Sequence, residues 1–184
     1  MVIVISFEVC MNKKIALITG SMNPFTMGHK HVVDMSLIIF DSVVVGIGHS
    51  PFKENENQIF TMEQRIRMAK ESLVEYSDKV IVREFSGAAI DFAEKVKASA
   101  IVRGIRNDMD GAYEASMSHA NSLMAELEIG RIIPTFYVPC PPSLTEVSSS
   151  RVRELIELKR SMEVLRHYVL PAVAKVIETE IYHI

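Results

Sequence analysis

Residues 15–29 read IALITGSMNPFTMGH, a short apolar run followed by a loop of small and turn-forming residues. The run at 15–19 is typical of a buried parallel strand. Gly20 lets the chain turn tightly off that strand, and Pro24 fixes the conformation of the turn. A helix then begins, and helix N-termini present free N–H groups and a partial positive charge. The stretch therefore predicts a strand–loop–helix unit that can hold a phosphate, with His29 one turn into the helix and facing the same space.

The rest of the chain repeats the alternation of apolar runs and amphipathic segments. Further strands are expected at residues 41–50, 79–85, 100–104 and 132–139. Helices are expected at residues 28–40, 61–75, 88–98, 110–127, 149–159 and 163–178. This order predicts an α/β protein, a single Rossmann-like doubly wound domain with a mostly parallel five-stranded sheet and helices on both faces. We expect residues 11–184 to form that domain, and residues 1–10 to be a candidate N-terminal extension ahead of it.

Composition limits the classes of function. The 184 residues are enough for a sizeable core, and 20 Lys and Arg against 23 Asp and Glu give a formal charge of −3. Such a chain has no general positive field for nucleic acid, so anionic ligands must be held by a few local groups. The apolar start of the chain is too short to span a bilayer, and the two cysteines match no metal or redox spacing. We expect a cytoplasmic protein without membrane attachment and without a dedicated metal centre.

Ligands of doubly wound sheets bind outside the carboxyl ends of the strands. Four unusual stretches of this chain fall at such ends, namely residues 20–29, 50–53, 103–106 and 143–151. In the third, Arg103 and Arg106 follow a buried strand, and each offers a fixed fork of donors that matches phosphate oxygens. In the fourth, three serines cap the start of a helix and offer hydroxyls beside its free N–H groups.

Each of these features also has an ordinary explanation. His29 can be a helix histidine with its hydrogen bonds satisfied, the arginines can be solvated, and the serines can serve only as a helix cap. The convergence of all four stretches on one edge of the sheet favours a single anion-binding site.

The residues at 26–29, TMGH, resemble the T/H-x-G-H signature of the nucleotidylyltransferase superfamily. From about residue 14 to 177 the chain is similar to bacterial phosphopantetheine adenylyltransferase. The later matching stretches are SPFK at 50–53, FSGAAIDFA at 85–93, RGIRNDMDGAYE at 103–114, HAN at 119–121 and VSSSRV at 147–152. Their order and spacing carry the resemblance over nearly the whole chain.

The resemblance implies transfer of AMP from ATP to 4′-phosphopantetheine, giving 3′-dephospho-coenzyme A and pyrophosphate. It implies Mg²⁺ bound with the ATP, and a homo-oligomer that is a hexamer in the family. It implies catalytic roles for His29, Lys53 and Arg106. It implies ATP contacts from Ser21, Met22, His29, Gly104, Ile105, Arg106, Glu114, Leu144, Thr145, Glu146, Val147, Ser148, Ser149 and Ser150. It implies acceptor contacts from Ser21, Lys53, Ala89, Arg103 and Asn121.

The sequence departs from the family pattern at a few positions, and these bear on the acceptor more than on the reaction. Asn23 replaces an aspartate, and Ala88 and Ala89 replace two large apolar residues, which predicts a wider pocket for the pantetheine arm. Leu144 stands where an aromatic residue is expected. Two other functions stay open. One is nucleotidyl transfer to another phosphorylated acceptor, such as nicotinamide mononucleotide or glycerol phosphate, and the other is a nucleotide-binding protein without catalysis.

Overall fold

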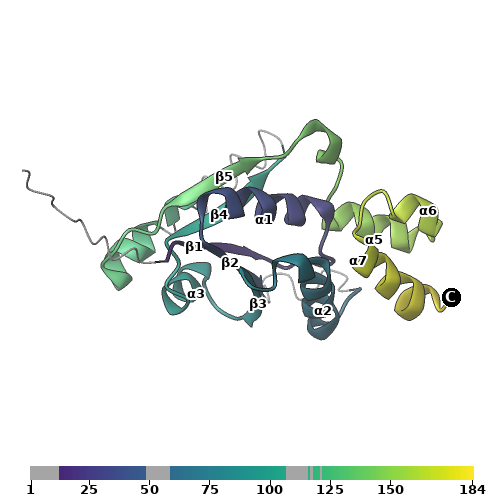
Figure 1. The fold of residues 1–184 in the computed structure, drawn as a ribbon, viewed down its shortest axis with the longest axis horizontal. Coiled ribbons are helices and arrows are strands. Elements are labelled where there is room, and N and C mark those ends of the chain that lie inside the picture. The colour runs from purple at the N-terminus through teal and green to yellow at the C-terminus, as the bar shows by residue number, and fades with distance from the viewer. Residues whose placement is uncertain (1–12, 49–58, 107–115, 117, 121) are drawn as a thin grey trace, which may run out of the picture.

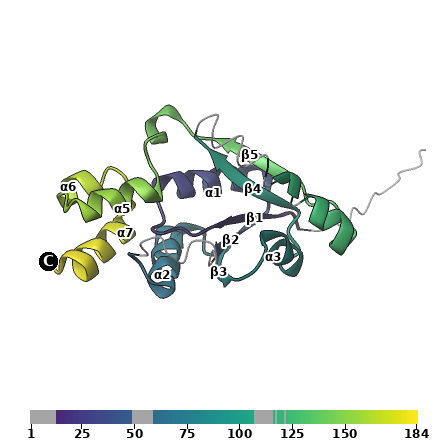
Figure 2. The same cartoon turned by 180° about the vertical axis from the view of Figure 1, so that it is seen from behind.

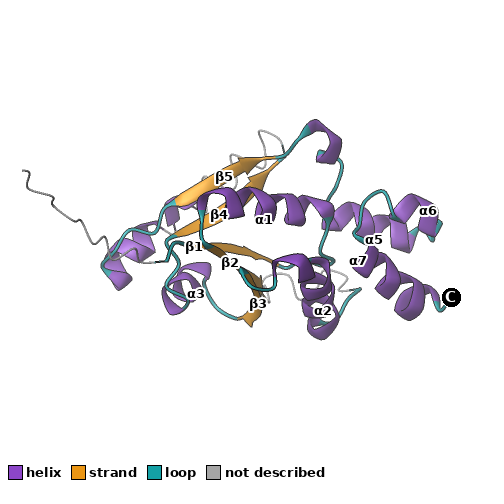
Figure 3. Cartoon of the chain, in the orientation of Figure 1, coloured by secondary structure: helices purple, strands orange, loops and turns teal. Residues whose placement is uncertain are grey.

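The computed structural model describes residues 13–48, 59–106, 116, 118–120 and 122–184. Its centre is a five-stranded sheet in which every neighbouring pair is parallel, in the order β3-β2-β1-β4-β5 (Figure 3). The strands are β1 (Ile15–Gly20), β2 (Ser42–Gly48), β3 (Val80–Phe85), β4 (Ala100–Ile105) and β5 (Thr135–Pro139). The predicted α/β class and the number of strands are confirmed.

Helices cover both faces of this sheet. The α-helices are α1 (Met27–Ile39), α2 (Met62–Ser72), α3 (Ala89–Lys95), α5 (Ser149–Glu157), α6 (Met162–Leu165) and α7 (Pro171–Val176). Shorter 3₁₀ turns are η1 (Val74–Tyr76) and η3 (Pro142–Leu144), and π-helical turns are η2 (Ala125–Ile129) and η4 (Ile177–Tyr182).

Alternation along the strands divides the core in two. Ile18 points into a large cluster with α1, α2 and the C-terminal helices, whereas its neighbour Leu17 points into a smaller cluster with α3 and η2 (Figures 1 and 2). On the second side, Phe92 of α3 stacks on Phe85 with ring centroids 4.8 Å apart. Burying a large apolar side chain contributes about 1.5–3 kcal/mol, so both layers stabilise the sheet.

Two predicted boundaries are wrong, and proline explains both. The strand predicted at 132–139 begins only at Thr135, because Pro134 has no N–H to donate and Ile132 is left exposed. The helix predicted at 163–178 is divided into α6 and α7, and Pro171 starts the second piece. The predicted helix at 110–127 lies partly outside the described residues, and its described part reaches Ile129 through η2.

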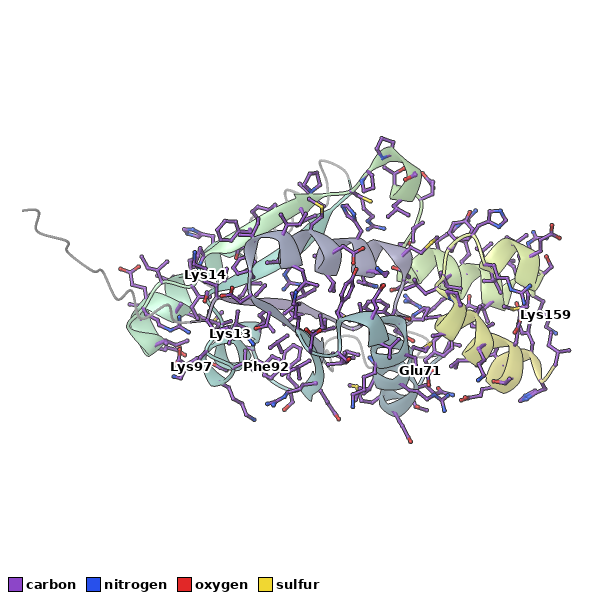
Figure 4. All side chains as sticks on the ribbon, in the orientation of Figure 1. Lys13, Lys14, Glu71, Phe92, Lys97 and Lys159 are labelled. Carbon is purple, nitrogen blue, oxygen red and sulfur yellow. The ribbon has the colours of Figure 1, made fainter. Side chains whose placement is uncertain are left out.

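The loop after β1 and the start of α5 meet beyond the carboxyl ends of the strands. Lys13 and Lys14, ahead of β1, lie at one end of the molecule, and Lys159, after α5, lies at the other (Figure 4). A Cβ atom added to Gly104 would come within 2.8 Å of the Val32 side chain, so glycine is what lets α1 lie this close to β4. In the described part of the chain, no helix has the length and apolar character needed to cross a bilayer.

Candidate active site

A cavity of about 320 Å³ opens at the carboxyl ends of β1 and β4, a volume suited to a small ligand. Three segments wall it: the loop after β1 with the first turns of α1, the end of β4, and the first residues of α5. Among its lining residues are Ser21, Met22, Gly28, His29, His31, Arg103, Gly104, Arg106, Cys140, Val147, Ser148, Ser149 and Ser150.

The loop between β1 and α1 is held from behind by side chains of three other elements. Carbonyl groups along the loop accept hydrogen bonds from β4, α2 and α5. The pairs are Arg103 Nη1 to Thr19 O at 2.9 Å, Arg65 Nη1 to Ser21 O at 2.9 Å, Arg153 Nη1 to Asn23 O at 2.8 Å, and Ser149 Oγ to Pro24 O at 2.8 Å. These carbonyls are therefore engaged by protein donors, and the loop is tied to both walls of the cavity.

His29 occupies the third position of α1 and has a defined tautomer. The backbone N–H of Thr26 donates to His29 Nδ1 at 3.0 Å, so the proton of the neutral ring is on Nε2. Burial, and then the positive charge of Arg106, lower the pKa of His29 to about 4. At neutral pH the ring is uncharged and offers one N–H to the cavity that it lines.

The start of α5 supplies the opposite wall. Ser148 caps the helix, its hydroxyl accepting the Arg151 backbone N–H at 3.1 Å. Ser149 and Ser150 follow in the first turn, where backbone N–H groups have no partner within a helix. The cavity thus combines hydroxyls, helix N–H groups and arginines, all of which suit phosphate oxygens.

The structure brings most of the predicted ATP-site residues to this cavity. Those that line it are Ser21, Met22, His29, Gly104, Arg106, Val147, Ser148, Ser149 and Ser150, together with Arg103 from the predicted acceptor set. The side chains of Ile105, Leu144, Thr145, Glu146 and Ala89 are not among the lining residues; Ala89 opens α3, on the other side of the sheet from α1. Lys53, Glu114 and Asn121 lie outside the described residues.

Several residues that hold the site were not predicted. His31 Nε2 donates to the Pro139 carbonyl at 3.2 Å, which links α1 to β5 beside the cavity. Arg65 and Arg153 hold the loop as described above. The spacing of residues in α2 indicates that Arg65 is buried. Met68 and Ala69, which follow it by three and four residues, are buried, so Arg65 lies on the same buried face of the helix.

The described residues contain no group of three or more His, Cys, Asp or Glu side chains that could hold a metal ion. The cavity lining is instead rich in hydrogen-bond donors and positive charge, and such a lining fits the phosphates of a nucleotide that brings its own metal ion.

Replacement of Gly28 by alanine tests whether a ligand binds in the cavity. A Cβ atom there would lie 3.6 Å from both Thr26 Oγ1 and the Val147 carbonyl, an ordinary contact, so the protein tolerates alanine. We expect Gly28→Ala to raise the free energy of unfolding by up to about 1 kcal/mol, because alanine favours the helix. We expect it to weaken nucleotide binding at least tenfold, because the methyl group enters the cavity. Thermal unfolding and calorimetric titration with ATP measure the two effects, and unchanged affinity would contradict this use of the cavity.

Comparisons with known proteins identify the fold and the family. A family model described as cytidylyltransferase-like matches residues 17–155. The solved structure of a putative nicotinate-nucleotide adenylyltransferase from Vibrio parahaemolyticus is similar with a TM-score of 0.64 and 18% identity, covering 94% of this chain and 96% of that one. A Plasmodium falciparum nicotinic acid mononucleotide adenylyltransferase is similar with a TM-score of 0.64 and 13% identity, covering 93% and 98%. At these identities the likeness shows that this chain shares its fold with those two adenylyltransferases.

Curated relatives narrow the family. A phosphopantetheine adenylyltransferase of Streptococcus agalactiae is 35% identical over 153 residues, covering 83% of this chain and 89% of the relative. One of Streptococcus gordonii is 35% identical over 173 residues, covering 94% and 98%. The chain belongs to the phosphopantetheine adenylyltransferases, within the cytidylyltransferase-like family.

Proposed function

We propose that this protein transfers AMP from ATP to 4′-phosphopantetheine, releasing pyrophosphate and forming 3′-dephospho-coenzyme A. The observation that carries the proposal is the meeting of His29, Arg106 and the start of α5 around one cavity. A neutral N–H donor then stands between cations and helix N–H groups, an arrangement suited to a phosphoryl group that gains charge during transfer.

The reaction is an in-line displacement. A non-bridging oxygen of the acceptor phosphate attacks the α-phosphorus of ATP, and the bond between that phosphorus and the oxygen bridging to the β-phosphate breaks. Pyrophosphate leaves with the bonding electrons. The acceptor phosphate is already ionised near neutral pH, so no general base is required, and catalysis rests on positioning and charge stabilisation.

Each wall of the cavity has a role in this scheme. His29 Nε2–H donates to the α-phosphoryl oxygens as their charge grows. Arg106 and the hydroxyls and N–H groups of 148–150 hold the leaving pyrophosphate. Ser21 holds the acceptor phosphate, together with Lys53 from outside the described residues. Mg²⁺ bound to the triphosphate would neutralise part of its charge beside Arg106 and the start of α5.

The contacts proposed for the acceptor involve fewer of the described residues than those proposed for ATP. Arg103 donates from Nη1 to Thr19 O and lines the cavity, and this position supports a contact between the arginine and the acceptor. Ala88 and Ala89 begin α3 in half-buried positions, and Asn121 lies outside the described residues. The family assignment, rather than this geometry, selects phosphopantetheine over another phosphorylated acceptor.

The decisive experiment offers purified protein Mg²⁺ and ATP with a panel of acceptors and measures pyrophosphate release. The panel contains 4′-phosphopantetheine, nicotinamide mononucleotide, nicotinate mononucleotide and glycerol phosphate. We expect turnover with phosphopantetheine and identification of dephospho-coenzyme A by mass. ATP binding without turnover on any acceptor would favour a non-catalytic nucleotide-binding protein.

We also propose that the protein works as a homo-oligomer, a hexamer by family, in the cytoplasm. The apolar residues of the C-terminal helices do not supply the contact face, because Leu165, Val173 and Ile177 are fully buried in the chain's own core. Exposed apolar side chains lie instead on α1 and the edge strand β5, including Met35, Ile38, Ile39, Phe136 and Tyr137. We expect light scattering to give an oligomer at micromolar concentration, and Ile38→Glu with Ile39→Glu to dissociate it. A wild-type monomer would contradict the assembly.

A further inference from the structure

Arg65 is a buried arginine that the reaction scheme does not use. It is 1% exposed, and its Nη1 donates to the Ser21 carbonyl at 2.9 Å. Its Nε and Nη2 atoms are buried and have no hydrogen-bond partner among the described residues, and Arg65 does not line the cavity. Burial lowers the pKa of Arg65, and the charge of Glu84 opposes that shift. Buried donors without partners oppose folding, so core packing does not account for arginine at this position.

The carbonyl that Arg65 binds belongs to a strained peptide. Met22 has a φ of 44°, a left-handed conformation that is costly for a residue with a side chain. The peptide between Ser21 and Met22 is trans, so its C=O and N–H point in opposite directions. With the oxygen directed at Arg65, the Met22 N–H points away from α2. Ser21 and Met22 line the cavity, so this N–H lies on the cavity side.

Turning this peptide over would relieve the strain. A half-turn takes the φ of Met22 from 44° to about −136°, a negative value within the φ range of extended backbone. The same motion would direct the Ser21 carbonyl oxygen toward the cavity and remove the Met22 N–H from it. A phosphate oxygen would then face the negative end of the carbonyl dipole in place of the N–H donor.

We propose that Arg65 is a positioning residue, which keeps the Ser21–Met22 peptide in its strained orientation so that the Met22 N–H donates to a nucleotide phosphate. Arg65 acts from the protein side and does not touch the ligand. The proposal rests on the proposed function for the identity of that ligand, while the orientation of the peptide is independent of it.

The test compares three variants on α2. Arg65→Met keeps an unbranched side chain of somewhat smaller volume and removes the unpaired donors, so we expect a free energy of unfolding equal to or above that of wild type. We expect its ATP affinity to fall at least tenfold and its kcat/KM to fall about 100-fold, as for a small displacement at a reacting centre. Arg65→Lys keeps one donor for the Ser21 carbonyl and should stay within about tenfold of wild type. Arg67→Met is the control: Arg67 is on the same helix, exposed and paired with Glu180.

Calorimetry, urea unfolding and steady-state kinetics are measured on all three, and a crystal structure of Arg65→Met is expected to have Met22 at negative φ. Wild-type ATP affinity in Arg65→Met, or an unturned peptide, would overturn the proposal. If Arg65→Met does not fold, Arg65→Lys decides the question. A stable lysine variant whose ATP affinity is far more than about tenfold below that of wild type would also overturn the proposal. Failure of the proposed function is seen separately, as a wild-type protein that binds ATP but releases no pyrophosphate.

Discussion

His29→Gln is expected to lower kcat by about 100-fold with little change in stability or in the KM for ATP, as when one donor to a transition-state oxyanion is moved out of place. Another helix of this chain shows why glutamine is a suitable replacement for His29. In α2, Gln64 occupies the same helix position as His29, and its Oε1 accepts the Thr61 N–H at 2.7 Å. A glutamine at 29 can accept the Thr26 N–H in the same way. It then keeps the cap, and the rigid imidazole Nε2–H is replaced by the N–H₂ of a more flexible amide that is not held at the position of the ring.

His29→Ala is the matched comparison, because it loses both the cap and the donor. We expect the same fall in kcat as for His29→Gln, with an additional loss of about 1 kcal/mol in the free energy of unfolding. Near-normal turnover in His29→Ala would remove His29 from the chemistry.

The pH dependence of stability distinguishes the same two proteins. The pKa of His29 is about 4 in the folded protein against 6.5 for the ordinary side chain. Between these values the unfolded state binds more protons, so the wild-type free energy of unfolding falls as the pH drops from 6.5 toward 4. At pH 5 the loss from this residue is about 1–2 kcal/mol relative to pH 7. His29→Gln lacks this contribution, and equal pH profiles from urea unfolding would contradict the burial of an uncharged ring.

Arg106→Met is expected to lower kcat/KM for ATP by 100-fold or more, because a charge-assisted contact with the leaving pyrophosphate is lost. It is also expected to raise the pKa of His29, since the Arg106 charge, after burial, is the second cause that lowers it. Titration of the His29 ring protons by NMR measures this shift in the free protein, and pyrophosphate release measures the rate.

Arg151→Met is the control for this variant. Arg151 lies in the first turn of α5 but pairs with Glu154 at 2.8 Å and does not line the cavity. We expect its kinetics to stay within about twofold of wild type, because exposed ion pairs contribute little. If Arg106→Met retains wild-type kinetics, pyrophosphate is held by the start of α5 alone.

The sequence by itself determined the class of the fold and most of the cavity. Apolar runs separated by helical patterns specify a parallel sheet, because each buried strand must be covered on both faces. The glycine and proline residues of the loop after β1, the pair Arg103 and Arg106, and the serines before α5 all follow strands or precede helices. Signals of this kind can be read from the sequence because they are local, and because the carboxyl ends of parallel strands all lie at one edge of the sheet.

The tertiary structure decided what depends on contacts between distant parts of the chain. The prolines at 134 and 171 place element boundaries where the sequence pattern did not predict them. A missing N–H has an effect only where a carbonyl group would otherwise accept a hydrogen bond from it. The tautomer and low pKa of His29 need both its burial and the charge of Arg106, 77 positions later in the sequence numbering. Arg65 and Arg153 act on the loop from α2 and α5, far from it in sequence. No local pattern encodes which carbonyl a long side chain will meet, because that depends on how the elements pack.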